Sequence, residues 1–259
     1  MQVLAIYSES GGVTKTTTAV SLAVIAARSG RKVTLLDLDP RAATTKWARV
    51  VPEEDHLHVG AILAYDDCEG YAEELGIVVP AWSENIRVIP AARSMSNREA
   101  EYADGAEYRL KTSLVGLESD LVVIDCPNRQ GGPLIKGALT AADSIVYASR
   151  LSEDGVDGVE GARQTVSQFK KNLARIGATH TLDELGVIAG DIDDRVVGTP
   201  AVERIAFEDL KQTELLLTPM VPKRTIVQQA RIAGEWYGDY PSGHKVLDAY
   251  TELSKKVIR

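Results

Sequence analysis

Short apolar runs alternate along the chain with stretches in which apolar residues recur every three or four positions. The runs are rich in Val, Ile and Leu, which is typical of buried strands of a parallel sheet. They lie at residues 3–7, 32–38, 86–89, 121–124, 144–148, 186–189 and 215–220. The helical patterns lie at residues 17–29, 159–176, 200–211 and 243–257. This alternation predicts an α/β fold with a mostly parallel sheet covered by helices on both faces.

The length of the chain and the lack of a linker pattern favour one domain. No internal repeat and no Ser/Pro-rich linker divides the 259 residues, so we expect a single domain over residues 1–259. Residues 53–83 are acidic and irregular, and we expect a solvated surface excursion there with a helix or two.

Cysteine content and hydropathy bear on the compartment. Two cysteines, Cys68 and Cys126, exclude a disulfide scaffold and suit a reducing cytosol. The apolar stretches are far shorter than the ~20 residues that span a bilayer. The N-terminal residues lack the basic segment and cleavage site of a secretory leader. We therefore expect a cytoplasmic protein with no membrane partner.

Charge is spread unevenly over the chain. The net charge is -8, yet residues 1–160 hold 15 basic and 24 acidic side chains, while residues 161–259 hold 14 and 13. An acidic protein does not favour nucleic acid. Because the acidity lies entirely in the first part, the neutral-to-basic remainder keeps an anionic partner open.

The strongest motif is the sequence SESGGVTKTTT at residues 8–18, between the first predicted strand and the first predicted helix. Ligands bind at this place in α/β sheets. Gly11 and Gly12 let backbone N–H groups approach an anion, and the following helix adds its positive N-terminal end. Lys15 supplies a charge for the outer phosphates, and Thr16 offers a hydroxyl to Mg²⁺. The predicted phosphate-binding residues are Gly11, Gly12, Val13, Thr14, Lys15, Thr16 and Thr17.

Carboxylates follow two of the predicted strands. Asp37 and Asp39 close the second strand, and Asp125 ends the apolar run LVVID. A carboxylate at such a strand end can hold Mg²⁺ directly or through water. An apolar run that ends in Asp is common, so it is the conjunction with Lys15 and Thr16 that makes these residues candidates. Beside them, Cys126 has no His partner in sequence, and we expect a buried, inert thiol.

These motifs together resemble the ParA family of partition ATPases. Gly11, Gly12, Lys15 and Thr16 match the family's deviant Walker A box, K-G-G-x-x-K-[ST], whereas the standard Walker A pattern does not fit. The segments DLDPRAATTKW, VIDCPNRQGG and MVPKRTIVQQA follow in the family's order. Two departures stand out: Ser10 occupies the place of the signature lysine, and Arg41 that of a usual Gln.

The resemblance implies a three-layer P-loop NTPase fold and a slow, partner-stimulated ATPase that uses ATP and Mg²⁺. It further implies an ATP-dependent homodimer, nonspecific DNA binding, a ParB-type adaptor and association with the nucleoid, in the service of plasmid or phage replicon partition. Carried over to this sequence, Lys15 and Asp39 are catalytic, with Asp39 orienting the attacking water or acting as base. Asp37 lies near the Mg²⁺ shell with Thr16 and Asp125, and Pro222 flanks the adenine.

The missing lysine leaves several interpretations open. In the family this lysine reaches the partner's phosphates. Ser10 stands at the same trans dimer contact, but its hydroxyl offers only a hydrogen bond there, which is worth far less than a cation. One interpretation is that another cation substitutes for the lysine, and Arg150, at the end of a predicted strand near the dimer face, is our first candidate. The other two interpretations are a modified route of ATP hydrolysis and a loss of activity. For DNA we expect the basic residues of the last hundred positions to serve. These are Lys170, Lys171, Arg195, Lys223, Arg224 and Arg231.

Three other functions remain open on sequence grounds. One is the same switch positioning a protein organelle such as the carboxysome, since relatives of that kind also look to lack the lysine. A MinD-like membrane-associated regulator is disfavoured by the short C-terminus KKVIR, which has no extended amphipathic basic helix. A metabolic P-loop enzyme is disfavoured by the absence of a second catalytic motif.

Overall fold

The computed structural model describes residues 1–100, 103–178, 180–194 and 200–259. Its centre is a seven-stranded sheet in the order β3-β4-β2-β5-β1-β6-β7. All neighbouring strands run parallel except β3, which pairs antiparallel with β4. The strands are β1 (Gln2–Tyr7), β2 (Val33–Asp37), β3 (Ile77–Val79), β4 (Ser83–Ile89), β5 (Leu121–Asp125), β6 (Ser144–Ser149) and β7 (Asp183–Ala189). The predicted α/β sheet is confirmed.

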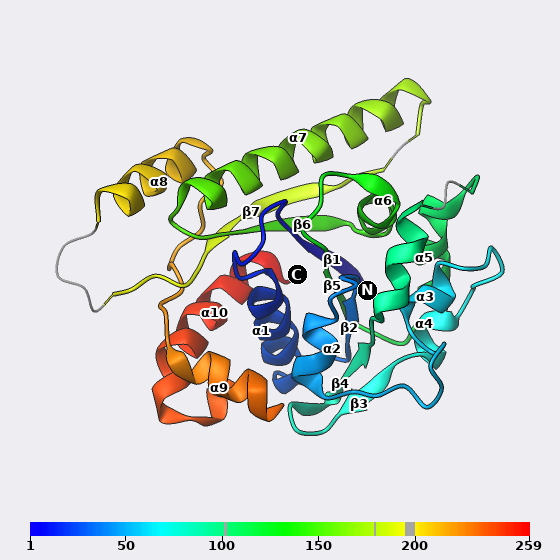
Figure 1. The fold of residues 1–259 in the computed structure, drawn as a ribbon, viewed down its shortest axis with the longest axis horizontal. Coiled ribbons are helices and arrows are strands. Elements are labelled where there is room, and N and C mark those ends of the chain that lie inside the picture. Colours follow the sequence, from blue (N-terminus) through cyan, green and yellow to red (C-terminus); the bar gives the residue numbers. More distant parts are fainter. Residues whose placement is uncertain (101–102, 179, 195–199) are drawn as a thin grey trace.

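Helices cover both faces of the sheet and give the molecule three layers (Figure 1). One face packs on α1 (Lys15–Arg28), α2 (Ala43–Ala48), α9 (Thr225–Ala233) and α10 (His244–Val257). The other packs on α3 (Val59–Ile62), α4 (Tyr71–Glu74), α5 (Arg109–Ser113), α6 (Gly132–Ala141), α7 (Glu153–Arg175) and α8 (Ala201–Gln212). Because β1, β2, β5 and β6 are buried on both faces, their sequences are continuous apolar runs rather than alternating patterns.

Two sequence predictions about secondary structure are wrong. Residues 215–220 form no strand: the segment touches the sheet through the isolated bridge of Leu216 to Val187, and Pro222 bridges Ile192 beyond it. Pro219 and Pro222 have no N–H group to donate, so a continuous ladder cannot form there. The helix predicted at 159–176 begins six residues earlier, because the Ser152 hydroxyl accepts a hydrogen bond from the Gly155 amide and caps α7.

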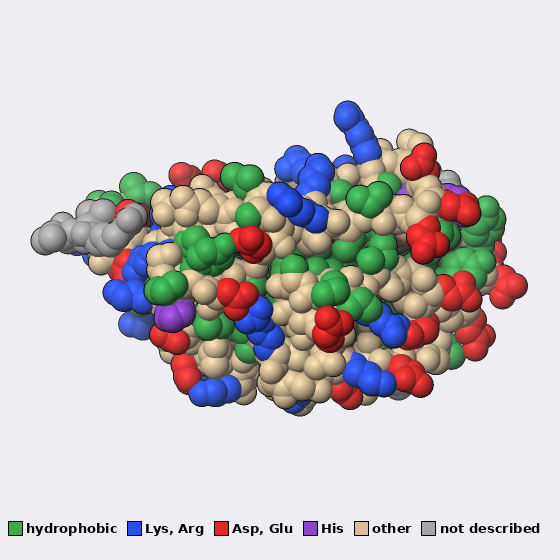
Figure 2. All heavy atoms as spheres, turned by 90° about the horizontal axis from the view of Figure 1, so that it is seen from below, with side chains coloured by type: hydrophobic (Ala, Val, Ile, Leu, Met, Phe, Trp, Pro, Cys, Tyr) green, Lys and Arg blue, Asp and Glu red, His purple; other side chains and the backbone are tan. Residues whose placement is uncertain are grey.

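Residues 53–83 are more than the surface excursion that their acidity predicts. They form α3 and α4, as expected, but also the edge strand β3. Cys68, Ala72 and Val59 are fully buried, and they pack in the core beside α5 and α6. The acidic side chains point outward instead. Figure 2 shows acidic side chains gathered at the end of the molecule at which Figure 1 places α3 and α4.

Candidate functional site

The loop between β1 and α1 is built to approach an anion. Gly12 and Thr14 have φ angles of 72° and 69°, in the left-handed region, and α1 begins immediately afterwards at Lys15. Glycine adopts this conformation without strain, whereas Thr14 does so at a cost. The backbone amides and the N-terminal end of α1 thus face a cavity of about 500 Å³. All seven predicted phosphate-binding residues line this cavity, as does Pro222, and we call it the nucleotide pocket after its predicted ligand.

Lys15 is held inside the loop that it serves. Its side chain is largely buried, and its Nζ donates a hydrogen bond of 2.6 Å to the Ser10 carbonyl oxygen. Burial lowers the pKa of Lys15, while the carboxylates of Asp125 and Asp39 oppose that change. A desolvated ammonium group beside two carboxylates is a strong receptor for phosphate oxygens, because little water must be removed when they arrive.

Asp37 and Asp125 face each other across neighbouring strands, since β2 and β5 pair with these two residues in register. Both are buried. Asp37 Oδ2 accepts hydrogen bonds from the Thr45 amide (2.8 Å) and the Thr45 hydroxyl (2.7 Å). Burial first, and the negative charge of Asp125 second, raise the pKa of Asp37 to about 7. A cation placed beside the pair would favour the ionised form of both carboxyl groups.

Asp125 has the unsatisfied atom expected of a metal-associated carboxylate. Its Oδ2 accepts a 2.8 Å hydrogen bond from the Thr44 hydroxyl, while its buried Oδ1 makes no hydrogen bond of normal geometry within the described residues. Burial raises the pKa of Asp125, and the hydroxyls of Thr44 and Thr16 partly counteract this. The described residues contain no group of three His, Cys, Asp or Glu side chains that could hold a metal alone. Mg²⁺ fits here with few protein ligands, because it retains water and takes phosphate oxygens.

Asp39 lies at the rim of the same pocket. It is half-buried, and its Oδ1 accepts a 2.9 Å hydrogen bond from the Arg41 amide. Its carboxylate therefore stands outside the buried Asp37–Asp125 pair but close enough to influence the pKa of Lys15. This position suits the predicted role of orienting a water molecule.

Arg150 directly follows β6 and lines the nucleotide pocket. Its guanidinium group forms an ion pair of 2.6 Å with Asp191, and Lys223 lies 3.5 Å from the same carboxylate. The Arg150 side chain is 44% exposed, so it stands at the mouth of the pocket, where a second molecule can reach it.

Ser10 does not line the pocket; it is turned toward α7. Its hydroxyl donates a 2.6 Å hydrogen bond to the Asp154 carbonyl oxygen in the first turn of that helix. A Cβ atom built on Gly158 would lie 2.5 Å from the Ser10 hydroxyl oxygen, so only glycine allows this approach. Further along, the Thr165 hydroxyl donates to Glu9 at 2.7 Å. The start of the phosphate loop thus lies on a glycine-lined face of α7.

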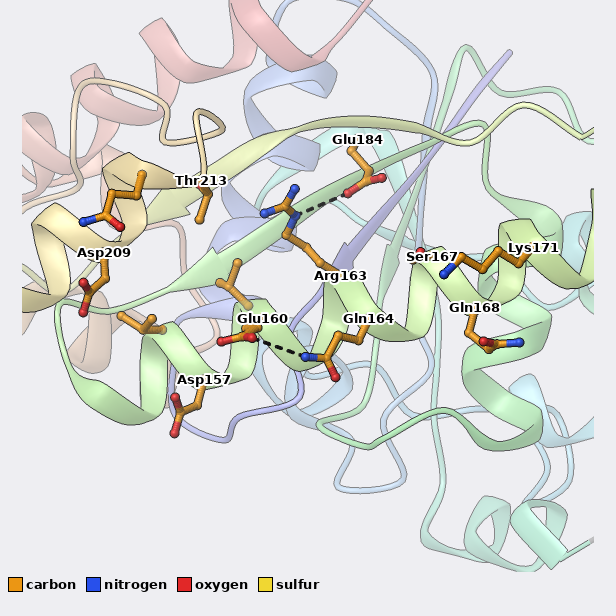
Figure 3. Close-up of a pocket in the computed structure, with 13 residues that line it drawn as sticks. Asp157, Glu160, Arg163, Gln164, Ser167, Gln168, Lys171, Glu184, Asp209 and Thr213 are labelled. Carbon is orange, nitrogen blue, oxygen red and sulfur yellow. Dashed lines mark hydrogen bonds and ion pairs between the residues drawn. The ribbon is translucent and has the colours of Figure 1, made fainter.

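The predicted DNA residues do not form one surface. Lys170, on α7, forms an ion pair of 2.8 Å with Glu184 of β7. Lys171 lines a groove of about 970 Å³ along α7 and α8. Figure 3 shows Lys171 at one end of this groove and the Arg163–Glu184 ion pair in its middle. Lys223, Arg224 and Arg231 instead line the nucleotide pocket, and Arg195 lies outside the described residues.

Several pocket residues were not among the predicted site residues. Thr44 and Thr45 hold the carboxylate pair, and Arg41, Asn128, Gln228 and Tyr250 line the cavity. Arg41 and the two threonines lie within the segment DLDPRAATTKW, and Asn128 lies within VIDCPNRQGG. Arg41 is already a departure from the family pattern, but the motifs alone assign none of these four residues a role. Gln228 and Tyr250 belong to α9 and α10, and only the tertiary fold brings them to the phosphate loop.

Comparison with known proteins identifies the family of the chain. A family model described as an AAA domain matches residues 1–176, which include the phosphate loop and both buried carboxylates. The chain belongs to this family. It is 28% identical to the sporulation initiation inhibitor protein Soj of Bacillus subtilis over 99% of this chain and 98% of Soj. It is also 28% identical to the chromosome-partitioning ATPase Soj of Thermus thermophilus, over 98% and 94% of the two chains. Membership of the ParA/MinD group of AAA domain proteins is thereby confirmed.

Solved structures give the same fold. Apo McdA of Cyanothece has a TM-score of 0.82 at 24% identity, over 97% of this chain and 98% of McdA. Cobyrinic acid a,c-diamide synthase of Mycobacterium smegmatis, with a bound ATP analogue and magnesium, has a TM-score of 0.78 at 26% identity, over 100% and 95%. The AAA domain scaffold of this chain is therefore shared by proteins with different names and tasks.

Proposed function

We propose that this AAA domain protein is a ParA-type ATPase that binds ATP and Mg²⁺ and drives the partition of a DNA replicon. The proposal rests on finding the pocket residues together in a chain that is similar to Soj proteins. Lys15, Thr16, Asp39 and the Asp37–Asp125 pair meet at the carboxyl ends of β1, β2 and β5. Soj proteins match the chain over nearly its full length.

The proposed chemistry follows from the pocket. The loop amides and Lys15 bind the phosphates, and Thr16 and Asp125 hold Mg²⁺, with Asp37 behind them. The bound metal supplies positive charge against the phosphate oxygens. Asp39, at the rim, orients the water that attacks the terminal phosphate. Hydrolysis to ADP and phosphate is slow until an adaptor of the ParB type completes the site.

ATP-dependent homodimerisation forms the second part of the proposal. Ser10 is bound to α7 and carries no charge, so we assign the contact with the partner's phosphates to Arg150 at the pocket mouth. Arg150→Ala is expected to abolish dimerisation with ATP while nucleotide binding by the monomer persists. Arg175→Ala, at the exposed far end of α7, is the matched control. Sedimentation with ATP and with ADP measures both, and unchanged dimerisation of Arg150→Ala would reject the assignment.

DNA binding is the third part of the proposal, and it best separates a partition ATPase from a metabolic enzyme. Nonspecific binding by several basic side chains falls steeply with salt. We expect the wild-type chain to bind DNA of unrelated sequences with ATP, to release it with ADP, and to lose affinity between low and physiological salt. Fluorescence anisotropy with labelled duplexes measures this. A chain that binds ATP but not DNA would instead fit a metabolic AAA domain enzyme, and nucleoid association would fail with it.

Positioning of a protein organelle is the second candidate function. The observation that favours it is Ser10 in place of the signature lysine, together with the fold shared with McdA. Both candidates use the same switch, so DNA binding does not separate them. Co-purification does: a DNA-bound adaptor supports replicon partition, and a shell or scaffold protein supports the organelle.

A MinD-like membrane regulator is disfavoured by packing. The C-terminal helix α10 is amphipathic, but its apolar residues Val246, Tyr250, Leu253 and Val257 are buried against the core face that includes α1. They are not free to enter a lipid surface. No helix among the described residues is long and apolar enough to cross a bilayer.

A further inference from the structure

The nucleotide pocket carries an unusual excess of positive charge. Two carboxylates line it, Asp39 and Asp191. Seven basic side chains do so as well, and they are Lys15, Arg41, Lys46, Arg150, Lys223, Arg224 and Arg231. A set of this size exceeds what the sequence motif alone assigned to phosphate, so the partner of each cation decides which of them is available to a ligand.

Most of these cations already have a protein partner. Arg150 and Lys223 share Asp191, and Arg224 forms two 2.7 Å hydrogen bonds with Asp194. The remaining lysines bind backbone carbonyl oxygens: Lys15 that of Ser10, and Lys46 that of Arg41.

Two cations remain without such a partner. Within the part of the chain that the structure describes, the guanidinium groups of Arg41 and Arg231 make no hydrogen bond or ion pair. They belong to different elements. Arg231 stands on α9, whereas Arg41 lies in the turn between β2 and α2, two residues after Asp39.

The backbone of Arg41 is fixed on the phosphate side. Its amide donates to Asp39 Oδ1 at 2.9 Å, and its carbonyl oxygen accepts a 2.7 Å hydrogen bond from Lys46 Nζ. Ala42 then turns the chain into α2 with a φ of 56°. The positive charge of Arg41 is near enough to lower the pKa of Lys15. An anchored backbone and a guanidinium group without a partner among the described residues, in the pocket that Lys15 also lines, form an arrangement suited to binding an anion.

We propose that Arg41 is a second cation for the terminal phosphate of ATP, supplied by the same chain, and that it raises the preference for ATP over ADP. The proposal rests on the proposed nucleotide site. A guanidinium group can form two charge-assisted hydrogen bonds with a phosphate. The neutral Gln usual in the family at this position cannot add charge. Arg41 thereby offsets, within one subunit, part of the charge lost at Ser10.

The test compares nucleotide affinities of the intact chain with Arg41→Gln, Arg41→Lys and the control Arg175→Gln. Binding of a nonhydrolysable ATP analogue and of ADP, each with Mg²⁺, is measured at protein concentrations where sedimentation shows monomers. A lost charge-assisted contact predicts that the ATP-to-ADP affinity ratio falls by about 10-fold to 100-fold in Arg41→Gln. Arg41→Lys should recover part of it, and Arg175→Gln should match the wild type.

The outcomes separate the inference from the function beneath it. An unchanged ratio in Arg41→Gln, with ADP still bound, overturns the role of Arg41 and leaves the ATPase intact. An equal loss of ATP and ADP affinity also overturns it, because the residue would then act on the loop rather than on the terminal phosphate. Failure of the wild-type chain to bind either nucleotide would instead overturn the proposed function.

Discussion

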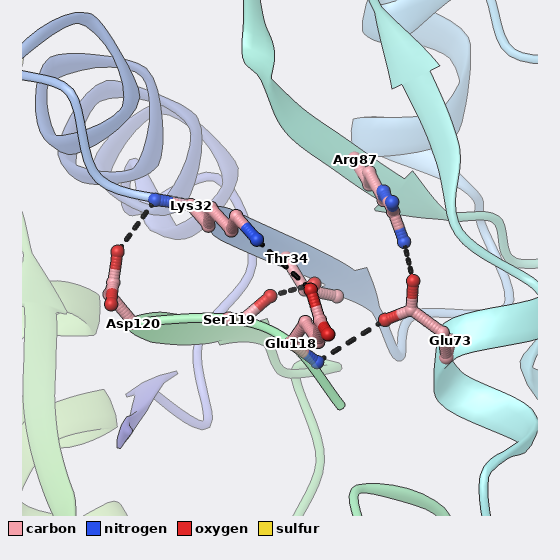
Figure 4. Close-up of polar contacts among 7 residues, drawn as sticks. All are labelled: Lys32, Thr34, Glu73, Arg87, Glu118, Ser119 and Asp120. Atoms are coloured by element: carbon pink, nitrogen blue, oxygen red, sulfur yellow. Dashed lines mark hydrogen bonds and ion pairs between the residues drawn. The ribbon is translucent and has the colours of Figure 1, made fainter. Parts of the chain in front are cut away.

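The two ends of the central sheet differ in how far their polar groups are paired by hydrogen bonds. At the amino ends of the strands the groups pair with one another (Figure 4). Thr34 and Ser119 share a 2.8 Å hydrogen bond, Asp120 accepts from the Lys32 amide at 2.8 Å, and Glu73 joins Arg87 to the Glu118 amide.

At the carboxyl ends, several buried polar atoms of the described residues have no hydrogen-bond partner, although their neighbours do. Five buried side-chain atoms in the described chain lack a hydrogen bond of normal geometry, and four of them surround the phosphate loop. These four belong to Ser8, Thr14, Asp125 and Arg150. Unpaired buried polar groups cost about 1–3 kcal/mol each. One end of the sheet therefore contributes stability, while the other gives up stability in readiness for a ligand.

The largest expected effect is on Lys15. Lys15→Ala removes the buried cation of the phosphate loop, and ATP hydrolysis should fall by at least about 100-fold. Lys32→Ala, the matched change at the amino end, removes a side chain that is 64% exposed and should leave the rate unchanged. A steady-state phosphate-release assay measures both. Equal rates in the two variants would contradict the assignment of ATP hydrolysis to the carboxyl ends of the strands.

The second effect is a dependence of stability on pH. Burial raises the pKa of Asp37 from 3.8 to about 7, so the folded state holds a proton that the unfolded state has released. The free energy of unfolding of the nucleotide-free chain should therefore fall as pH rises through this interval. Asp37→Asn should make the decline shallower. Urea denaturation across the interval measures it, and stability that rises with pH would contradict the assignment of Asp37.

The third effect compares two fully buried threonines, Thr44 and Thr34. Thr44 donates to the Asp125 carboxylate, whereas Thr34 bonds the neutral Ser119 hydroxyl. Thr44→Val should cost about 1.5–3 kcal/mol and Thr34→Val about 0.5–1.5 kcal/mol of unfolding free energy. Only Thr44→Val should also slow hydrolysis. If Thr34→Val were the more costly change, the hydrogen bond to the Asp125 carboxylate would not be the stronger of the two.

The smallest effect belongs to the amino-end surface. Glu118→Gln breaks the ion pair with Lys32, in which the two side chains are 76% and 64% exposed. Exposed pairs contribute less than about 1 kcal/mol. Thermal unfolding should barely change, and a large shift would show that the amino end is more cooperative than its pairwise contacts imply.

The sequence predicted those parts of the molecule whose causes are local. The phosphate loop was found because Gly11, Gly12, Lys15 and Thr16 are adjacent, and buried strands because their apolar runs are unbroken. Residues 215–220 show the limit of this reasoning. They are as apolar as a strand, but the prolines at 219 and 222 prevent regular pairing.

Long-range pairing explains the remaining differences. Lys170 and Arg224 are basic residues in sequence, yet Glu184 and Asp194 already bind them in the folded chain. The place of Ser10 is set by the Asp154 carbonyl, 144 positions away. Such contacts depend on which helices and strands pack together, and local patterns of charge or hydropathy do not predict that packing.

The contact between Ser10 and Gly158 also limits how the sequence can diverge. A lysine at position 10 would forfeit the hydrogen bond that the Ser10 hydroxyl donates to the Asp154 carbonyl oxygen. A side chain at position 158 would collide with Ser10 as the loop now stands, because a Cβ atom there would lie 2.5 Å from the Ser10 hydroxyl oxygen. The small residue at position 10 and the glycine at position 158 are therefore expected to change together.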